Sequence, residues 1–235
     1  MATVILVRHG RTSANADGVL AGRSAGVRLD ERGTGQAEAI AARLAAVPLS
    51  GLVTSPLARC RQTASAIAAG QATPPEVVVD AGLAECDYGA WTGRPLKALA
   101  REKLWRLVQR QPSAATFPEG ESLGEMFARA TTAVRRRDAA LTAEHGPGAL
   151  WVAVSHGDVI KAVLADALGM HLDAFQRIVV DPGSVSIVRH TAERPYVLAM
   201  NTLAGDLDWL RPRGRRRRRT GPPDDAVVGG GAGPA

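Results

Sequence analysis

The sequence predicts an α/β fold, a three-layer α/β/α sandwich with a mostly parallel central sheet and helices on both of its faces. Two observations support this fold class. Short apolar, β-branched runs alternate along the chain with longer segments of helical periodicity. No repeat of fixed period is present, which argues against a repeat architecture. Strands that alternate with helices over this length are typical of parallel sheets covered on both faces.

The expected strands and helices follow from these patterns in chain order. Apolar, β-branched runs predict strands at residues 3–7, 51–54, 76–79, 150–155, 184–189 and 196–200. Helical periodicity predicts helices at residues 30–46, 57–69, 122–143 and 158–168, the first with Asp30 as its cap. The stretch GESLG at 120–124 matches a serine hydrolase motif, but no strand precedes it. Ser122 followed by Glu125 is better interpreted as a capping box.

Length and composition indicate a globular protein. The chain has 235 residues, 46% hydrophobic and 22% charged, enough for one sizeable domain, expected at residues 1–210. No apolar stretch approaches the ~18 residues of a membrane helix, and the first residues lack the features of a secretion signal. Cys60 and Cys86 form no C-x-x-C pair. We therefore expect a cytoplasmic protein without a membrane partner.

The net charge of +6 is concentrated near the C-terminus. Residues 211–235 hold seven arginines and two aspartates together with many glycines and prolines, a composition that predicts a disordered tail. Such a tail is compatible with electrostatic binding to nucleic acid. No aromatic residue interrupts its basic stretch for base stacking, so a solvated extension without a dedicated partner is favoured.

Basic residues and histidines follow three of the predicted strands. Arg8 and His9 follow the first, Arg59 lies a few residues after the second, and His156 follows the fourth. Ligands of open parallel sheets bind beyond the carboxyl ends of the strands, so these side chains are expected in one cationic crevice. Two arginine forks suit an oxyanion, of which phosphate is the commonest.

Two glycines support a ligand site at these strand ends. Gly10 and Gly157 each follow a histidine at a predicted strand-to-helix junction. There they are expected to let the backbone approach a ligand and to expose N–H groups at a helix start.

The histidines and one carboxylate predict phosphoryl chemistry in this crevice. A neutral imidazole is nucleophilic near neutral pH, and a second histidine can donate a hydrogen bond to a phosphate oxygen. A proton donor for the leaving oxygen is also needed. Glu85 lies in the turn-rich stretch LAECDYGAWTG, where partial burial beside Tyr88 and Trp91 is expected to raise its pKa.

The chain resembles the histidine phosphatase superfamily, also called the phosphoglycerate mutase-like proteins. Its N-terminal signature R-H-G-x-T-x-x-N is present at residues 8–15. Further landmarks match in order over roughly residues 3–200. They are AGR at 21–23, L-x-x-x-G-x-x-Q-A at 29–37, SPLARCRQTA around Arg59, LAECDYGAWTG around Glu85, PEGES at 118–122 and VSHGDVIKAVL around His156.

The resemblance implies a role for each matching residue. It implies that His9 is the nucleophile, that Arg8, Arg59 and His156 hold the phosphate oxygens, and that Glu85 protonates the leaving group. It also implies that the substrate is a small phosphorylated metabolite, that no metal or other cofactor takes part, and that the protein is a monomer or homodimer. The further residues expected to bind phosphate or substrate are Asn15, Thr12, Gly22, Arg23 and Gly157.

Two positions depart from the family pattern. Arg11 stands where Glu is usual, and either extends the cationic field or points to solvent. Asp158 stands where Gly is frequent. It either raises the pKa of His156 or caps the following helix, and capping is favoured because Asp is a strong cap residue.

Hydrolysis is the favoured activity. Family mutases have an N-E-R-H-Y-G stretch and a long covering segment, whereas this chain reads AECDYG and has only 71 positions between Glu85 and His156. A phosphohistidine open to water is lost as phosphate. A phosphoglycerate mutase-type phosphomutase and a non-catalytic relative that binds a phosphorylated ligand remain alternatives. The leaving group of the substrate stays undetermined at this point.

Overall fold

Six strands form one sheet in the order β3-β2-β4-β1-β5-β6. The first four in this order are parallel, whereas β5 pairs antiparallel with β1 and β6 antiparallel with β5. The strand bounds are β1 Thr3–Arg8, β2 Gly51–Thr54, β3 Val77–Val79, β4 Leu150–Ser155, β5 Val185–Arg189 and β6 Tyr196–Thr202. The computed structural model describes residues 1–211, so the tail predicted for 211–235 lies outside the described residues except for Arg211.

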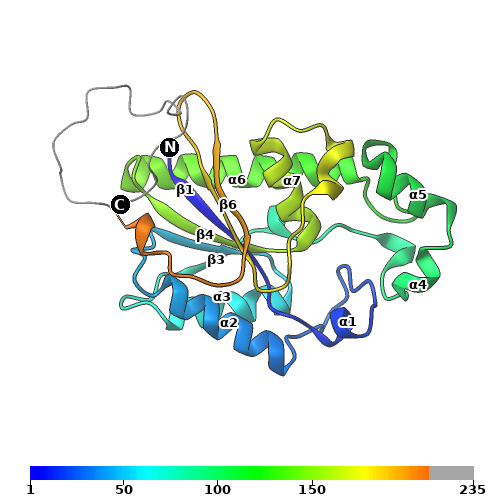
Figure 1. Cartoon of the computed structure of the whole chain (residues 1–235), viewed down its shortest axis with the longest axis horizontal. Coiled ribbons are helices and arrows are strands. Elements are labelled where there is room, and N and C mark those ends of the chain that lie inside the picture. Colours follow the sequence, from blue (N-terminus) through cyan, green and yellow to red (C-terminus); the bar gives the residue numbers. More distant parts are fainter. Residues whose placement is uncertain (212–235) are drawn as a thin grey trace.

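Four long helices cover the two faces of the sheet (Figure 1). Helices α2 (Glu31–Leu44) and α3 (Ala58–Ala69) pack on one face, and α6 (Leu123–His145) and α7 (Gly157–Ala167) on the other. This arrangement confirms the predicted α/β/α sandwich with a mostly parallel sheet.

Strand β1 illustrates why the central strands are apolar throughout. Val4 and Leu6 belong to the core beneath α6 and α7, whereas Ile5 and Val7 belong to the core beneath α2 and α3. All four are at most 1% exposed. Because successive side chains of a strand point to opposite faces, a strand covered on both faces has to be apolar at every position.

Side-chain caps fix the starts of two helices. The Asp30 carboxylate accepts a hydrogen bond from the amide of Gly33 and starts α2. Ser122 and Glu125 form a reciprocal capping box at the start of α6. The capping interpretation of GESLG is therefore confirmed, since Ser122 begins a helix and follows no strand.

Two glycines allow α2 to pack directly against the loop after β1. A Cβ on Gly10 would collide with the carbonyl of Gly33, and one on Gly33 would collide with the backbone of Arg11. The amide of Gly10 donates to the hydroxyl of Thr63, 3.2 Å away. The expectation that Gly10 permits close approach of a ligand is therefore wrong, because this glycine permits close approach of a helix.

Several short helices were not predicted. Helices α4 (Leu96–Leu99) and α5 (Lys103–Arg110) lie at the end of the molecule where the parallel strands end (Figure 1). The others are α1 Ser13–Ala16 and the 3-10 helices Ala81–Leu83, Gly89–Trp91, Pro112–Ala114, Leu172–Arg177 and Asp208–Leu210.

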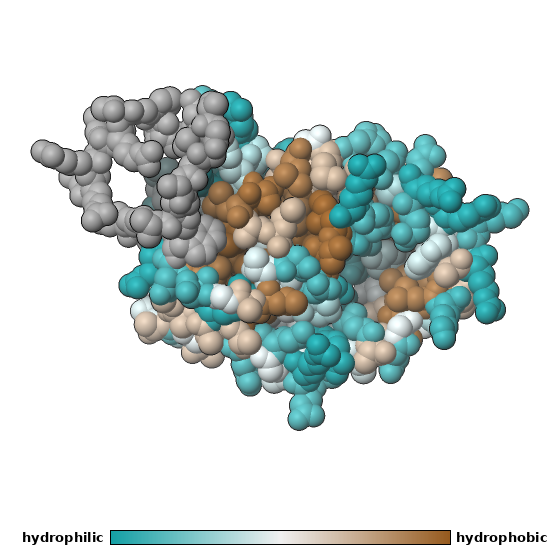
Figure 2. All heavy atoms as spheres, viewed as in Figure 1, coloured by the Kyte–Doolittle hydropathy of each residue, from teal (hydrophilic) through white to brown (hydrophobic). Residues whose placement is uncertain are grey.

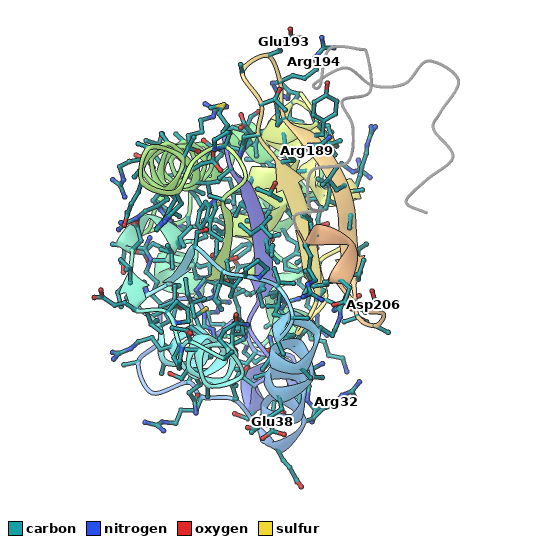
Figure 3. All side chains as sticks on the ribbon, turned by 90° about the vertical axis from the view of Figure 1, so that its left-hand side faces the viewer. Arg32, Glu38, Arg189, Glu193, Arg194 and Asp206 are labelled. Atoms are coloured by element: carbon teal, nitrogen blue, oxygen red, sulfur yellow. The ribbon has the colours of Figure 1, made fainter. Side chains whose placement is uncertain are left out.

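The segment after β6 returns alongside α2, and Asp206 marks it in Figure 3. Arg43 of α2 donates hydrogen bonds to the carbonyls of Gly205 and Thr202, at 2.8 and 3.1 Å. Leu207 is buried in the core beneath α2 and α3. Within residues 1–211, no helix has the length and apolar character needed to cross a membrane.

Candidate active site

The four parallel strands bring the predicted residues together at one edge of the sheet. Arg8 ends β1 and His9 follows it, Arg59 lies in the first turn of α3 after β2, His156 follows β4, and Glu85 follows the 3-10 helix after β3. The rings of His9 and His156 have centroids 5.2 Å apart. Arg8, His9, Arg59 and Glu85 line one cavity of about 320 Å³. Figure 2 shows a hollow at this end of the molecule.

His9 is held as a neutral imidazole with one available lone pair. Its Nδ1 lies 2.7 Å from the carbonyl oxygen of Gly10, an acceptor, so Nδ1 carries the hydrogen. Arg59 Nε donates to Nε2 at 3.1 Å, which assigns the lone pair to Nε2. Burial, together with the charges of Arg59 and Arg8, lowers the pKa of His9 well below its ordinary value. At neutral pH, Nε2 therefore carries no proton, which is the form in which an imidazole can act as a nucleophile.

His156 is also buried and neutral. Arg59 Nη2, which can only donate, lies 3.2 Å from His156 Nδ1, so the Nε2 hydrogen of His156 points to Ser55 Oγ at 2.8 Å. Burial and the neighbouring Arg59 and His9 lower the pKa of His156 well below its ordinary value. In this arrangement His156 orients Arg59, and a direct bond from His156 to phosphate stays a prediction.

Arg8 and Arg59 each have a buried donor that finds no partner within residues 1–211. Arg8 Nη1 donates to the carbonyl of Val180 at 2.6 Å, but no acceptor faces Arg8 Nε. Arg59 uses Nε and Nη2, the latter also donating to the carbonyl of Gly22 at 2.8 Å, and Arg59 Nη1 is unpaired. Buried, unpaired donors on charged groups are costly, so this pair is suited to an anion.

Glu85 is a buried carboxyl group whose pKa lies near neutrality. Its side chain is only 12% exposed, and Oε2 lies 3.7 Å from Nδ1 of His156. Burial and then the charge of Asp158 raise the pKa of Glu85 to about 7. The expectation of a raised pKa agrees with this environment, although Asp158 acts here in addition to the predicted burial.

Two arginines outside the cavity hold the loop that carries Glu85. Arg129 of α6 donates to the carbonyls of Gly82, Ala84 and Glu85 at 2.8 to 3.0 Å. Arg23 donates to the carbonyl of Glu85 at 2.8 Å. Both guanidinium groups also pair with the carboxylate of Glu121.

The structure places the other predicted binding residues in different ways. Thr12 and Asn15 line the cavity and bond to each other in the capping box of α1. Gly22 lines it as well and accepts from Arg59 through its carbonyl. Gly157 begins α7 beneath the guanidinium of Arg8. The structure does not bring Arg23 into the cavity, because its guanidinium pairs with Asp87 and Glu121 instead.

The two departures from the family pattern are explained by their contacts. Arg11 forms an ion pair with Asp30 at 2.8 Å and does not line the cavity, so it extends no cationic field there. Asp158 lies in the first turn of α7 and caps no helix, and the pKa of the adjacent His156 is lowered. Both expectations for Asp158 are therefore wrong. Its carboxylate faces the cavity and accepts from the Tyr88 hydroxyl at 2.8 Å.

Sequence reasoning missed three residues near the site. Ser55 follows β2, so the rule that found the residues after the other strands applied to it as well. Trp105 lines the cavity and stacks on Trp91. Arg129 carries no signal in the sequence, because it is one of several arginines on a long helix.

Two negative observations complete the description of the site. Within the described residues, no group of three or more His, Cys, Asp or Glu side chains is arranged to hold a metal ion. A larger hollow of about 940 Å³ lies at the opposite ends of β2 and β3 and contains none of the predicted site residues.

Fold and site together define an α/β protein with two buried histidines, two arginines and a buried carboxyl group at the carboxyl ends of its parallel strands. The model of the histidine phosphatase superfamily (branch 1) matches residues 4–203. The chain belongs to this superfamily.

The proteins that match most of this chain include some named as phosphatases and some named as mutases. A protein described as a probable phosphoglycerate mutase, GpmB, from Cronobacter sakazakii is 35% identical over 215 residues, covering 89% of this chain and 95% of its own. The alpha-ribazole phosphatase of Shigella flexneri superimposes with a TM-score of 0.75 at 24% identity, covering 86% of this chain and 97% of its own.

A third relative was solved with a phosphorylated ligand. The phosphoserine phosphatase of Entamoeba histolytica, in complex with 3-phosphoglyceric acid, superimposes with a TM-score of 0.75 at 22% identity. The match covers 86% of this chain and 98% of that one. Membership of the superfamily supports an enzyme, and the structural matches establish the phosphoglycerate mutase-like fold.

Proposed function

We propose that the protein is a phosphomonoester hydrolase that acts on a small phosphorylated metabolite through a phosphohistidine on His9. One observation carries this proposal: Arg8 Nε and Arg59 Nη1 are buried without partners, and Arg59 also touches Nε2 of His9. A phosphoryl group bound there satisfies both donors and presents its phosphorus atom to the imidazole. The cavity of about 320 Å³ has the size of a small-molecule site.

The proposed reaction has two steps. In the first, Nε2 of His9 attacks phosphorus, the bond to the ester oxygen breaks, and Glu85 gives its proton to that oxygen. In the second, water attacks the phosphorus of the phosphohistidine, the P–Nε2 bond breaks, and the Glu85 carboxylate takes a proton from the water. This releases phosphate and regenerates neutral His9 and protonated Glu85. In this scheme the guanidinium groups supply the positive charge that stabilises the equatorial oxygens, so the proposal needs no metal ion.

Phosphoglycerate mutase activity is the second candidate, favoured by the name of the relative that is 35% identical. Both activities share the first step and differ in what accepts the phosphoryl group. We favour water because the Glu85 side chain is 12% exposed at the cavity and no second alcohol is needed. The proposal includes a cytoplasmic location, with which the free thiols of Cys60 and Cys86 are compatible.

The test is phosphate release from 4-nitrophenyl phosphate by the His9→Ala variant. We expect a loss of about a thousandfold or more in kcat, since removing a nucleophile abolishes the covalent route. His145→Ala, which changes an exposed histidine outside the site, is the matched control. Undiminished turnover by His9→Ala would refute the mechanism. A parallel assay with 3-phosphoglycerate measures mutase activity.

A further inference from the structure

The wall of the cavity that faces the leaving group is aromatic. Tyr88, Trp91 and Phe117 are at most 5% exposed, and the Phe117 ring makes edge contacts with the other two at 5.0 and 5.3 Å. Trp105, on α5, stacks on Trp91 with ring centroids 6.1 Å apart and is only partly buried. All four line the cavity. The rings support one another and leave the partly exposed Trp105 available to a ligand.

Each positively charged side chain that lines the cavity either faces the proposed phosphoryl position or has a side-chain partner. Arg8 and Arg59 face the phosphoryl position, and the remaining cation lining the cavity within the described residues is Lys161. Its Nζ lies 2.9 Å from Gln176 Oε1 and 3.4 Å from Asp158 Oδ1. A carboxylate on the leaving group therefore has no unpaired cation to bind, and the negative charge of Asp158 repels it.

The position of Asp158 is fixed from both sides. Tyr88 donates to its Oδ2, and Lys161 approaches its Oδ1. Because Tyr88 belongs to the aromatic wall, the carboxylate and the rings form one surface. That surface accepts hydroxyl groups and flat apolar groups and disfavours anions.

We propose that the site selects phosphomonoesters whose leaving group is uncharged and carries a flat apolar portion, and that Asp158 discriminates against leaving groups that bear a carboxylate. This inference rests on the proposed hydrolase function and gives its substrate class. Trp105 provides the apolar contact, and Asp158 paired with Lys161 provides the discrimination.

The test compares three monoesters by kcat/KM at one pH. Glycerol 3-phosphate and 3-phosphoglycerate differ at the end remote from phosphate, where a hydroxymethyl group replaces a carboxylate, and 1-naphthyl phosphate adds a flat apolar group. We expect 1-naphthyl phosphate to be the best substrate, with 3-phosphoglycerate at least about tenfold below glycerol 3-phosphate, as expected for a like charge in a partly buried site. Equal or better hydrolysis of 3-phosphoglycerate would overturn the inference.

Two variants assign the selectivity to its residues. Asp158→Asn frees Lys161 and is expected to reduce the preference for glycerol 3-phosphate over 3-phosphoglycerate by about tenfold. Trp105→Ala is expected to reduce the preference for 1-naphthyl phosphate over glycerol 3-phosphate by about tenfold, with partial rescue by Trp105→Phe. Arg106→Ala, at an exposed position on the same helix, is the control and leaves both ratios unchanged. The Asp158 ratio compares two primary alkyl phosphates in one variant, so a changed fraction of protonated Glu85 cancels.

The outcomes separate the inference from the function on which it rests. If phosphate release depends on His9 but neither ratio responds to its variant, the substrate class is wrong and the hydrolase proposal stands. If His9→Ala releases phosphate from all three esters as fast as the unaltered protein, both fail.

Discussion

At the scale of single residues, Glu85 combines a reactive position with a pKa close to neutrality. Burial and the charge of Asp158 raise its pKa to about 7, whereas the pKa of His9 is lowered well below its ordinary value. The first step needs a protonated Glu85 and a neutral His9. We therefore expect kcat/KM for glycerol 3-phosphate, whose alkoxide leaving group needs the proton, to be highest on the acidic side of pH 7 and to fall about tenfold per pH unit above it.

Variants assign this alkaline limb to Glu85. Glu85→Gln is expected to lower kcat strongly and to remove the fall, because no group then loses a proton near neutral pH. Asp158→Asn is expected to move the fall to lower pH, because a carboxylate that stabilises the protonated form of Glu85 is lost. A profile of the unaltered protein that stays flat between pH 6 and 9 would contradict the assignment.

The same scale shows what a single sequence reveals about a site. Arg8, His9, Arg59 and His156 were predictable because each lies at the end of a parallel strand or within a few residues after it, and a parallel sheet brings such positions together. The contacts of Asp158 were not predictable, since a carboxylate in a first helical turn is compatible with a cap. Only the placement of Tyr88, 70 positions earlier in the chain, shows that Asp158 faces the cavity.

At the scale of elements, α6 positions the loop between β3 and Tyr88. Arg129 donates hydrogen bonds to three carbonyls of that loop, those of Gly82, Ala84 and Glu85. We expect Arg129→Met to lower kcat for glycerol 3-phosphate about tenfold or more with a smaller change in KM, because misplacing a proton donor by a fraction of an ångström is costly. Arg135→Met, also on α6, is the control, because it removes only a surface ion pair with Asp166 of α7. A loss of equal size in both variants would show that α6 matters only for stability.

Asp138 connects three elements in the interior. Its carboxylate is 1% exposed and accepts from the Trp151 indole of β4 and the amide of Ala2, with His190 3.2 Å away. Burial alone would raise the pKa of Asp138, but the hydrogen bonds and charge from His190, Trp151 and Ala2 hold it below its ordinary value. This contribution to stability is therefore present above about pH 4, the ordinary carboxyl range, and is lost as the pH falls through the lowered pKa.

Removal of this carboxylate should be strongly destabilising. We expect Asp138→Ala to lower the free energy of unfolding by about 2–4 kcal/mol, since buried donors are left unpaired. Asp166→Ala, which removes the partner of a largely exposed arginine, should cost less than about 1 kcal/mol. Urea denaturation near neutral pH measures both. Equal, small losses would contradict the interpretation of Asp138 as a structural connection.

The predictability of an element depended on whether it forms a layer of the sandwich. The predicted strands and long helices agree with the structure to within two residues at each end, because each buries an apolar face against the sheet. The short helices α4 and α5 were missed. Helices of four and eight residues are not stable by themselves, so their formation depends on tertiary contacts that no local pattern contains.

At the scale of the whole molecule, the site depends on the register of four adjacent strands. Arg8, Glu85, Arg59 and His156 come from segments up to 148 positions apart, and only the order β3-β2-β4-β1 unites them. A ligand that bonds to all of these segments therefore binds only the folded chain, and its binding free energy adds to the stability of the entire fold.

We expect inorganic phosphate to raise the Tm of the protein accordingly. At a phosphate concentration about 100-fold above Kd the gain is about 2.7 kcal/mol, which corresponds to roughly 5–10 °C for a domain of this size. Phosphate also stabilises proteins without binding to a site, so Arg59→Met in the same buffers measures that general effect. His9→Ala retains both arginines and should keep most of the specific shift. Differential scanning calorimetry measures the Tm shifts. Equal shifts in the unaltered protein and in Arg59→Met would show that the unpaired guanidinium donors do not form an oxyanion site.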